Sequence, residues 1–318
     1  MEGFRKFTKK FPQLILWFIL AAFLLLLPTF FPLYVLIHTI DVIIIILFAV
    51  SFNLLYGYMK EISFGHAGFF GLGAYTMVAL TKYTQVNLFI AMLIGILFVL
   101  LYALFVSPLV TRLSGIFFAL CSLALGEFVA IIVWSSRALG GDVGIHFSII
   151  TLQEMKIFYY ITLAIASICI MAMYKIANSP FSLAIRAIGD NISRVESIGI
   201  KVLRYRMAIF IISAGFTGIA GLLYCILHGM VHPRIASWEM LLSPLVGTLL
   251  GGAEIFSGPI IGTAIYYTIY WQIGGMTSYW EYFTGGLIII IVIFLPTGIM
   301  PTFHTLVKLV KQKLKKEP

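Results

Sequence analysis

Ten long apolar stretches constrain this 318-residue chain more than any other feature. A helix needs about 20 mostly apolar residues to cross a bilayer. Stretches of this kind lie at 13–33, 36–56, 64–81, 88–110, 115–134, 157–177, 207–229, 239–252, 257–272 and 282–300. Only 10% of the residues are charged, whereas a soluble domain carries about a quarter. We therefore expect an all-α polytopic membrane protein with about ten transmembrane helices, forming one domain over 1–318.

The eighth and ninth stretches, 239–252 and 257–272, are short and rich in glycine. They either cross the bilayer fully or form a re-entrant pair. A re-entrant pair is tolerated only where protein shields its backbone from lipid. The sequence leaves both arrangements open.

Lysine and arginine are distributed unequally across this ten-span arrangement. Seventeen of the 21 fall on the side that holds both termini, and four fall on the other side: Lys82, Arg137, Lys156 and Arg234. Basic residues concentrate on the cytoplasmic side of membrane proteins. We therefore expect both termini and the 178–206 loop in the cytoplasm. The basic balance thus reflects orientation in the lipid bilayer and does not indicate nucleic-acid binding.

The longest polar interruption runs from Asn178 to Arg206. Ser179 followed by Pro180 is typical of a helix start, because the hydroxyl caps and proline fits the first turn. An apolar face with helical spacing follows, and Gly189 is expected to end this helix. Its residues are Phe181, Ala184, Ile185 and Ile188.

A second short helix is expected directly after the first. Asp190 or Asn191 is placed to cap it, Val195 and Ile198 give it an apolar side, and Gly199 is placed to stop it. Two short amphipathic helices outside the membrane need a surface to bury against. Composition alone favours equally the bilayer surface and a soluble docking partner.

Three polar residues inside apolar stretches are candidate intramembrane sites: Asp41, His66 and Glu127. Ionisable residues at membrane depth are functional candidates by default. Asp41 lies near the outer end of its stretch, where it is expected to reach water. For Glu127 and for the isolated His66 we favour local hydrogen bonding over proton or ion transfer.

Two outer loops are candidates for contact with an external protein, although ordinary solvated loops are the simpler interpretation. The loop 135–156 carries Asp142 in a Gly-Gly-Asp turn, and the loop 230–239 carries His232 and Arg234. No nucleotide-binding, nucleophile or metal motif is visible, so we expect no enzyme activity and no cofactor. The three cysteines lie in apolar stretches and are expected to be core residues.

Three stretches carry a resemblance to a known family. The first runs from Asn53-Leu54-Leu55-Tyr56-Gly57 to Gly65-His66-Ala67-Gly68, and the second from Gly115-Ile116-Phe117-Phe118 to Gly126-Glu127. The third starts at Ser179-Pro180-Phe181, passes Glu196-Ser197-Ile198-Gly199 and reaches Gly218-Ile219-Ala220-Gly221. With these residues the chain resembles the inner-membrane permeases of branched-chain amino acid ABC importers, the LivM type, over roughly 40–300. It departs from the family at Lys60-Glu61-Ile62 and in the loop 135–156.

The resemblance implies that the 178–206 loop couples the permease to a cytoplasmic ATPase, so it favours the docking interpretation. The residues it assigns to this coupling are Phe181, Ala184, Ile185, Arg186, Ala187, Ile188, Gly189, Asp190, Glu196 and Gly199. It also implies two ATPase subunits, a second related permease and an extracytoplasmic solute-binding protein. Transport of branched-chain amino acids by alternating access is then expected. The alternatives are an ABC permease for urea, amides or a simple sugar, and an ion-coupled carrier that uses Asp41 and Glu127.

Overall fold

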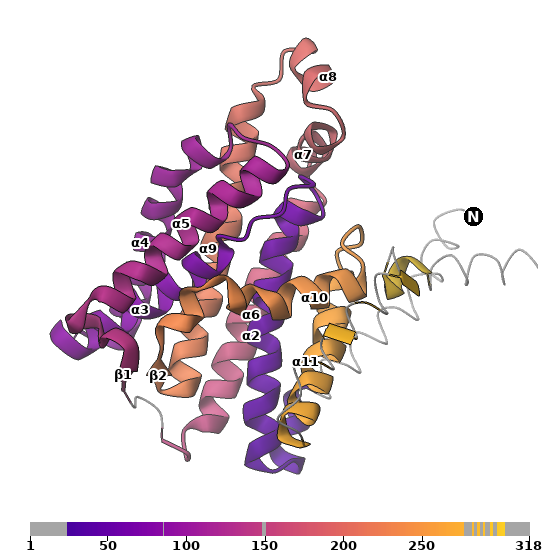
Figure 1. Ribbon diagram of the computed structural model, residues 1–318. Coiled ribbons are helices and arrows are strands. Elements are labelled where there is room, and N and C mark those ends of the chain that lie inside the picture. Colours follow the sequence, from indigo (N-terminus) through magenta and orange to yellow (C-terminus); the bar gives the residue numbers. More distant parts are fainter. Residues whose placement is uncertain are drawn as a thin grey trace, which may run out of the picture.

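A computed structural model describes residues 24–84, 86–147 and 151–276, together with 282, 285, 286, 289, 293, 294 and 298–302 (Figure 1). Five helices in this part are long and apolar enough to cross a membrane. They are α2 (Leu33–Tyr56), α4 (Leu88–Val110), α5 (Ile116–Ser135), α6 (Met155–Ala177) and α9 (Val202–His228). The expected all-α polytopic fold is confirmed, while the first and last predicted spans lie mostly outside the described residues.

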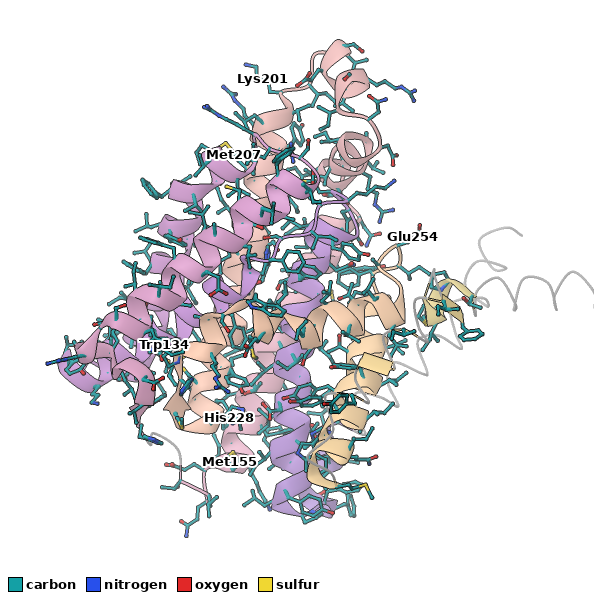
Figure 2. The ribbon with its side chains drawn as sticks, in the orientation of Figure 1. Trp134, Met155, Lys201, Met207, His228 and Glu254 are labelled. Atoms are coloured by element: carbon teal, nitrogen blue, oxygen red, sulfur yellow. The ribbon has the colours of Figure 1, made fainter. Side chains whose placement is uncertain are left out.

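Two further helices have 19 residues each, α3 (His66–Thr84) and α11 (Gly258–Met276). The only strands among the described residues are β1 (Ile145–His146) and β2 (Met230–Val231), which pair antiparallel. The short helices α7 (Pro180–Asp190) and α8 (Ile192–Ser197) lie at one end of the molecule, and β1 and β2 lie toward the opposite end (Figure 1). Lys201 and His228 mark these two ends of the ribbon in Figure 2.

Helix α9 is the centre of the bundle and packs against α2, α3 and α4. Lipid tails supply no hydrophobic drive for helices to associate, so close packing depends on small residues that let backbones approach. Gly221 shows this, since a Cβ added there would lie 1.9 Å from the backbone oxygen of Phe70 on α3. Gly73 and Gly218 meet in the same seam. The glycine-rich sequence therefore sets the spacing between α3 and α9.

Residues 229–252 lead from the end of α9 back toward the start of α11. They do so as several short segments, and we call this stretch the broken crossing. Near its start, His228 contacts Asp41 and β2 pairs with β1. Just past its end, the Ala253 oxygen accepts a hydrogen bond of 3.1 Å from the Asn53 side chain, close to the other end of α2. Between these points lie η3 (Pro233–Ala236), η4 (Trp238–Leu241) and α10 (Leu242–Gly251).

The short apolar helix predicted over 239–252 agrees with η4 and α10, which run on from one another as an apolar helix over Trp238–Gly251. A ten-residue helix such as α10 is about 15 Å long, half of what a bilayer core requires. The helical turns η3 and η4 pack on α3 and α5, which shields the backbone of these turns from lipid. Gly251 and Gly262 then bring α10 and α11 into backbone contact. The crossing is therefore made by several short segments buried against protein.

Candidate functional site: the α7–α8 loop and its attachment

The α7–α8 loop, residues 178–201, forms the two capped helices that the sequence predicts. The Ser179 hydroxyl accepts a hydrogen bond from the Ser182 N–H at 3.4 Å, and Pro180 occupies the first turn of α7. The Asn191 side chain accepts one from the Arg194 N–H at 3.0 Å and caps α8. Gly199 follows with a φ of +84°, a conformation that glycine adopts without strain. Asn191, and not Asp190, is therefore the second cap.

The apolar face of α7 is buried against its own chain. Ile185 and Ile188 are 0% and 2% exposed. A Cβ at Gly189 would lie 2.9 Å from the Met59 oxygen, which places α7 directly on the turn after α2. This corrects the expectation that Ile185 and Ile188 supply the face buried in a partner. Part of the predicted amphipathic pattern is therefore buried within this chain itself.

Ring contacts hold the same helix from its two sides. The guanidinium of Arg186 lies 4.3 Å from the centroid of the Tyr58 ring. Phe181 stacks on Tyr205 in the first turn of α9, with centroids 5.5 Å apart. The α7 helix is thus fixed both to the turn after α2 and to the start of the central helix.

A different set of side chains on the loop faces outward. Leu183 and Ile198 are large apolar residues that are 69% and 71% exposed. Ala187 and Glu196 are also exposed. These residues form the surface that α7 and α8 offer to another molecule.

An exposed ion pair links the loop to the turn after α2. Lys60 Nζ lies 2.5 Å from a carboxylate oxygen of Asp190, and this contact holds the pKa of Asp190 below its ordinary value. Lys60 has a φ of +59°, a left-handed conformation that is uncommon for residues other than glycine. Because both side chains are mostly in solvent, the pair contributes little to stability.

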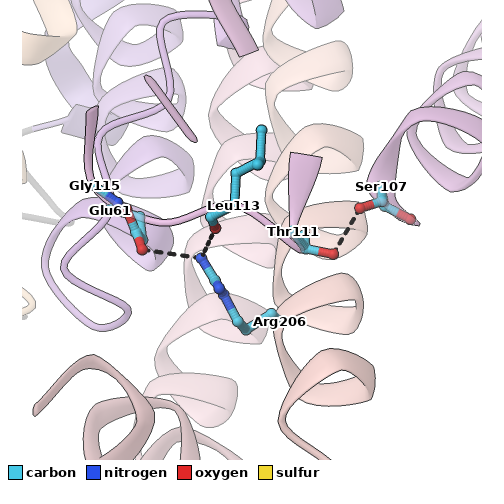
Figure 3. A network of polar contacts seen from close by, with 6 residues as sticks. All are labelled: Glu61, Ser107, Thr111, Leu113, Gly115 and Arg206. Carbon is cyan, nitrogen blue, oxygen red and sulfur yellow. Dashed lines mark hydrogen bonds and ion pairs between the residues drawn. The ribbon is translucent and has the colours of Figure 1, made fainter. Parts of the chain in front are cut away.

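A buried ion pair lies behind this surface (Figure 3). Arg206 Nη2 lies 2.9 Å from Glu61 Oε1, and both side chains are almost fully buried. The second Glu61 oxygen accepts a hydrogen bond from the Gly115 N–H at 2.8 Å, and Arg206 donates to the Leu113 oxygen at 2.6 Å. Burial raises the pKa of Glu61, against the opposing effects of Gly115 and Arg206. We call these four residues the Glu61–Arg206 network.

The Glu61–Arg206 network joins the turn between α2 and α3, the turn between α4 and α5, and the first turn of α9. A cavity of about 360 Å³ separates it from α7 and α8. Sequence reasoning noted Glu61 only as a departure from a family pattern and Arg206 only as one of many basic residues. The available signal was an arginine at the start of an apolar helix, a position where a buried charge requires a partner.

The two acids inside apolar stretches each have a partner. Asp41 was expected to reach water, but it is only 8% exposed and its carboxylate lies 3.0 Å from His228 Nε2. The expectation is therefore wrong, and Asp41 is buried. Glu127 accepts a hydrogen bond of 2.8 Å from the Trp238 N–H at the start of η4. Asp41 lies on α2 and Glu127 on α5, and in the described part of the chain no hydrogen bond or ion pair joins the two acids.

His66 belongs to a buried hydrogen-bonded chain within the bundle. Its Nε2 lies 2.7 Å from the Ser213 hydroxyl, which donates to the Ser51 oxygen at 2.5 Å. The Ser51 hydroxyl lies 2.8 Å from that of Thr217. This chain connects α2, α3 and α9. No cluster of His, Cys, Asp or Glu suited to a metal ion occurs in the described part of the chain.

The residues predicted to contact an external protein lie in two different settings. Asp142 is exposed in η2 (Gly141–Val143), which follows η1 (Arg137–Leu139) beyond α5. His232 caps η3 by accepting a hydrogen bond of 3.2 Å from the Arg234 N–H. Arg234 therefore belongs to the broken crossing, where η3 packs on α3 and α5, and not to a loop that projects outward.

Comparisons with known proteins agree with this arrangement. The family described as the permease component of branched-chain amino acid transport systems matches residues 34–293. The high-affinity branched-chain amino acid transport system permease protein LivM of Escherichia coli (strain K12) is 23% identical, over 90% of this chain and 75% of the relative. Its counterpart in Salmonella typhimurium (strain LT2) is 24% identical, over 88% and 73%.

A third relative is about as similar in sequence as the first two. The probable branched-chain amino acid transport permease protein LivM of Methanocaldococcus jannaschii is 24% identical, over 67% of each chain. No solved structure matches this chain. Since the family match covers most of the sequence, including the bundle and the α7–α8 loop, the chain belongs to the family of permease components of branched-chain amino acid transport systems.

Proposed function

We propose that this chain is the permease subunit of an ATP-binding-cassette importer for branched-chain amino acids. The observation that carries the proposal is the α7–α8 loop, which exposes Leu183, Ala187 and Ile198 while its other face is fixed to α9. In an ATP-driven importer, such a contact would pass work from an ATPase to the permease. The family is one of transport permeases and not of enzymes.

The complete transporter would contain two cytoplasmic ATPase subunits, a second related permease and an extracytoplasmic solute-binding protein. The chain would lie in the inner membrane of a bacterial cell with both termini in the cytoplasm. The unequal distribution of basic residues supports this orientation. The α7–α8 loop would then face the ATPases, and the end with β1 and β2 would face the binding protein. Substrate would pass by alternating access between two permease halves.

Uptake measurements test this proposal directly. Deleting the gene should lower the uptake of leucine, isoleucine or valine and leave the uptake of a simple sugar unchanged. Uptake should depend on ATP and persist when an uncoupler collapses the ion gradient. Normal uptake of all three amino acids, in a strain without a redundant system, would instead favour a permease for urea or amides. Uptake that fails with the uncoupler while ATP stays high would favour an ion-coupled carrier.

A further inference from the structure

The broken crossing places charged side chains at membrane depth. The Trp238 N–H contacts Glu127, which lies eight residues, about 12 Å, from the end of α5 at Ser135. Ala236 packs on Gly71, which lies inside α3 and not at either end of that helix. Because the bilayer core is about 30 Å thick, η3 and η4 lie well inside it. Figure 1 shows α10 beside α2, between the level of α8 and that of β1.

Two charged residues of this segment are exposed on the surface of the subunit. Arg234 and Glu239 are both exposed, and Trp238 between them is 45% exposed. Among the ion pairs that join described residues, none includes Arg234 or Glu239. An unpaired arginine facing lipid at this depth is very unfavourable, so such residues face a water-filled cavity or another subunit. This surface is therefore not in contact with lipid chains.

We propose that Arg234, Trp238 and Glu239 line the translocation path and bind the zwitterionic part of an amino acid. This inference rests on the proposed function. A guanidinium binds a carboxylate with two parallel hydrogen bonds, and a carboxylate such as Glu239 suits an ammonium group. The half-exposed indole offers an apolar surface to an aliphatic side chain.

The backbone around these residues is suited to a substrate path. Transporters build midplane sites from discontinuous helices, because an interrupted helix exposes polar groups where substrate passes. Here η3 is separated by Ser237 from the short apolar helix Trp238–Gly251, which η4 and α10 form together, and the Glu127 carboxylate fixes the start of that helix. Glu127 is therefore a positioning residue that holds Trp238, and through it the neighbouring charged side chains.

The first experiment asks whether this surface meets water in the assembled transporter. The complete importer, with its ATPases and binding protein, is reconstituted from a permease whose three cysteines are replaced by serine. Arg234→Cys is then treated with a water-soluble cationic thiol reagent. The matched control is Phe128→Cys, which adjoins Glu127 on α5 and is 54% exposed at the same depth. We expect labelling of Arg234→Cys about tenfold faster than the control, since such reagents attack a thiolate in water.

Labelling should also slow when binding protein loaded with leucine is present. The second experiment compares Arg234→Gln with Arg234→Lys over a range of loaded binding protein that extends to saturation. Transport per ATP hydrolysed should fall about tenfold or more in Arg234→Gln, because a buried substrate carboxylate loses its partner. Arg234→Lys should retain more transport, since it keeps the charge but not the two-point geometry.

Three results would overturn the inference. One is labelling of Arg234→Cys no faster than that of Phe128→Cys. Another is normal transport by Arg234→Gln. The third is an Arg234→Gln importer that needs more binding protein for half-maximal transport yet reaches the same maximal rate, which would make Arg234 a contact for the binding protein. Failure of the proposed function is distinguishable, because the unmodified importer would then not carry leucine at all.

Discussion

The Nε2 atom of His228 lies 3.0 Å from a carboxylate oxygen of Asp41. The pair joins α2 to the last residue of α9, and the His228 ring also lies against Tyr224 with centroids 4.1 Å apart. His38, one turn from Asp41, packs on Trp271 of α11 with centroids 4.4 Å apart. Three helices thus meet around Asp41 at the end of the bundle that holds β1 and β2. A carboxylate committed to such a contact acts more naturally as a helix linker than as a carrier of ions.

Asp41→Asn should therefore leave ATP-driven uptake largely intact. The amide keeps an oxygen that can accept from His228, so the free energy of unfolding should fall by only about 1 kcal/mol. Asp41→Leu removes the acceptor and should cost about 1–3 kcal/mol. Thermal unfolding of the purified permease and uptake by reconstituted importer measure the two effects. Loss of uptake in a stable Asp41→Asn protein would instead support an ion-coupled carrier.

Gly221→Ala should destabilise the bundle. The added Cβ would lie 1.9 Å from the backbone oxygen of Phe70, and a backbone atom in a packed helix cannot move aside cheaply. Overpacking of this kind costs about 1–3 kcal/mol or more. Gly274→Ala is the matched control, because nothing lies within 4 Å of the Cβ position there. Equal unfolding temperatures for the two variants would show that α3 and α9 separate more easily than their packing suggests.

Arg206→Met should destabilise the permease in a way that depends on pH. It removes the cation that opposes the raised pKa of Glu61, so that pKa should rise further above its ordinary value. A carboxyl whose pKa is raised in the folded state stabilises the fold at low pH and loses that contribution as pH rises through the folded pKa. The variant should therefore lose more stability at pH 8 than at pH 5, by about 3–5 kcal/mol where Glu61 is ionised.

Two comparisons make the Arg206→Met measurement specific. The double variant Arg206→Met with Glu61→Gln should regain stability at pH 8, because no unpaired charge is left buried. Glu154→Gln changes an exposed glutamate at the start of α6 in the same way and should have little effect. If Arg206→Met matched the unmodified protein at both pH values, the Glu61–Arg206 network would contribute nothing to the fold.

Orientation in the membrane is open to labelling of single cysteines. Ser193 in α8 and Asp142 in η2 are both exposed, and they lie beyond opposite ends of the bundle. A cysteine at Ser193 should react only with reagent from the cytoplasm, and one at Asp142 only with reagent from outside. A third at Lys313, outside the described residues, should behave like Ser193. Labelling of position 193 from outside would invert the proposed orientation.

The sequence predicts regular helices well where one physical signal acts alone. The spans 88–110 and 115–134 agree with α4 and α5 to within one residue, because continuous apolar runs leave no alternative in lipid. The start of α9 was predicted five residues late, since Arg204 and Arg206 suggest water. Arg206 is instead buried, and its charge is paired with Glu61, a residue 145 positions away in the sequence. Pairs that distant in sequence leave no local pattern to read.

The same limit applies to the candidate site. Local caps at Ser179 and Asn191 were enough to predict both helices of the α7–α8 loop. Periodicity alone does not say which molecule covers an apolar face, and Ile185 is covered by the permease itself. The sequence also left open how 239–252 lies in the bilayer, because the shielding of η3 and η4 by α3 and α5 is a tertiary contact. Tertiary contacts decide these features, and a single sequence does not contain them explicitly.

Helix α7 has a face buried in the chain and a face exposed to solvent. Substitutions on the two faces should therefore have different effects, one on folding and the other on coupling to the ATPase. Ala187→Glu and Leu183→Asp place charges on the exposed side, so the permease should fold and reach the membrane normally. In the proposed ATPase contact, each buried unpaired charge should cost several kcal/mol, against about 8 kcal/mol for a micromolar partner. The ATPase should then co-purify poorly or hydrolyse ATP without transport.

Ile185→Asp tests the inner face of the same helix. This residue is 0% exposed within the permease, so its variant should lower the unfolding temperature and the abundance of the subunit even without an ATPase. A cysteine at Leu183 should cross-link to the ATPase, whereas one at Ile185 should not. If Ala187→Glu and Leu183→Asp both transported normally at normal abundance, α7 would not be the element that receives work from ATP hydrolysis. The attachment of its inner face to Tyr58, Met59 and α9 would then serve only to hold the loop in place.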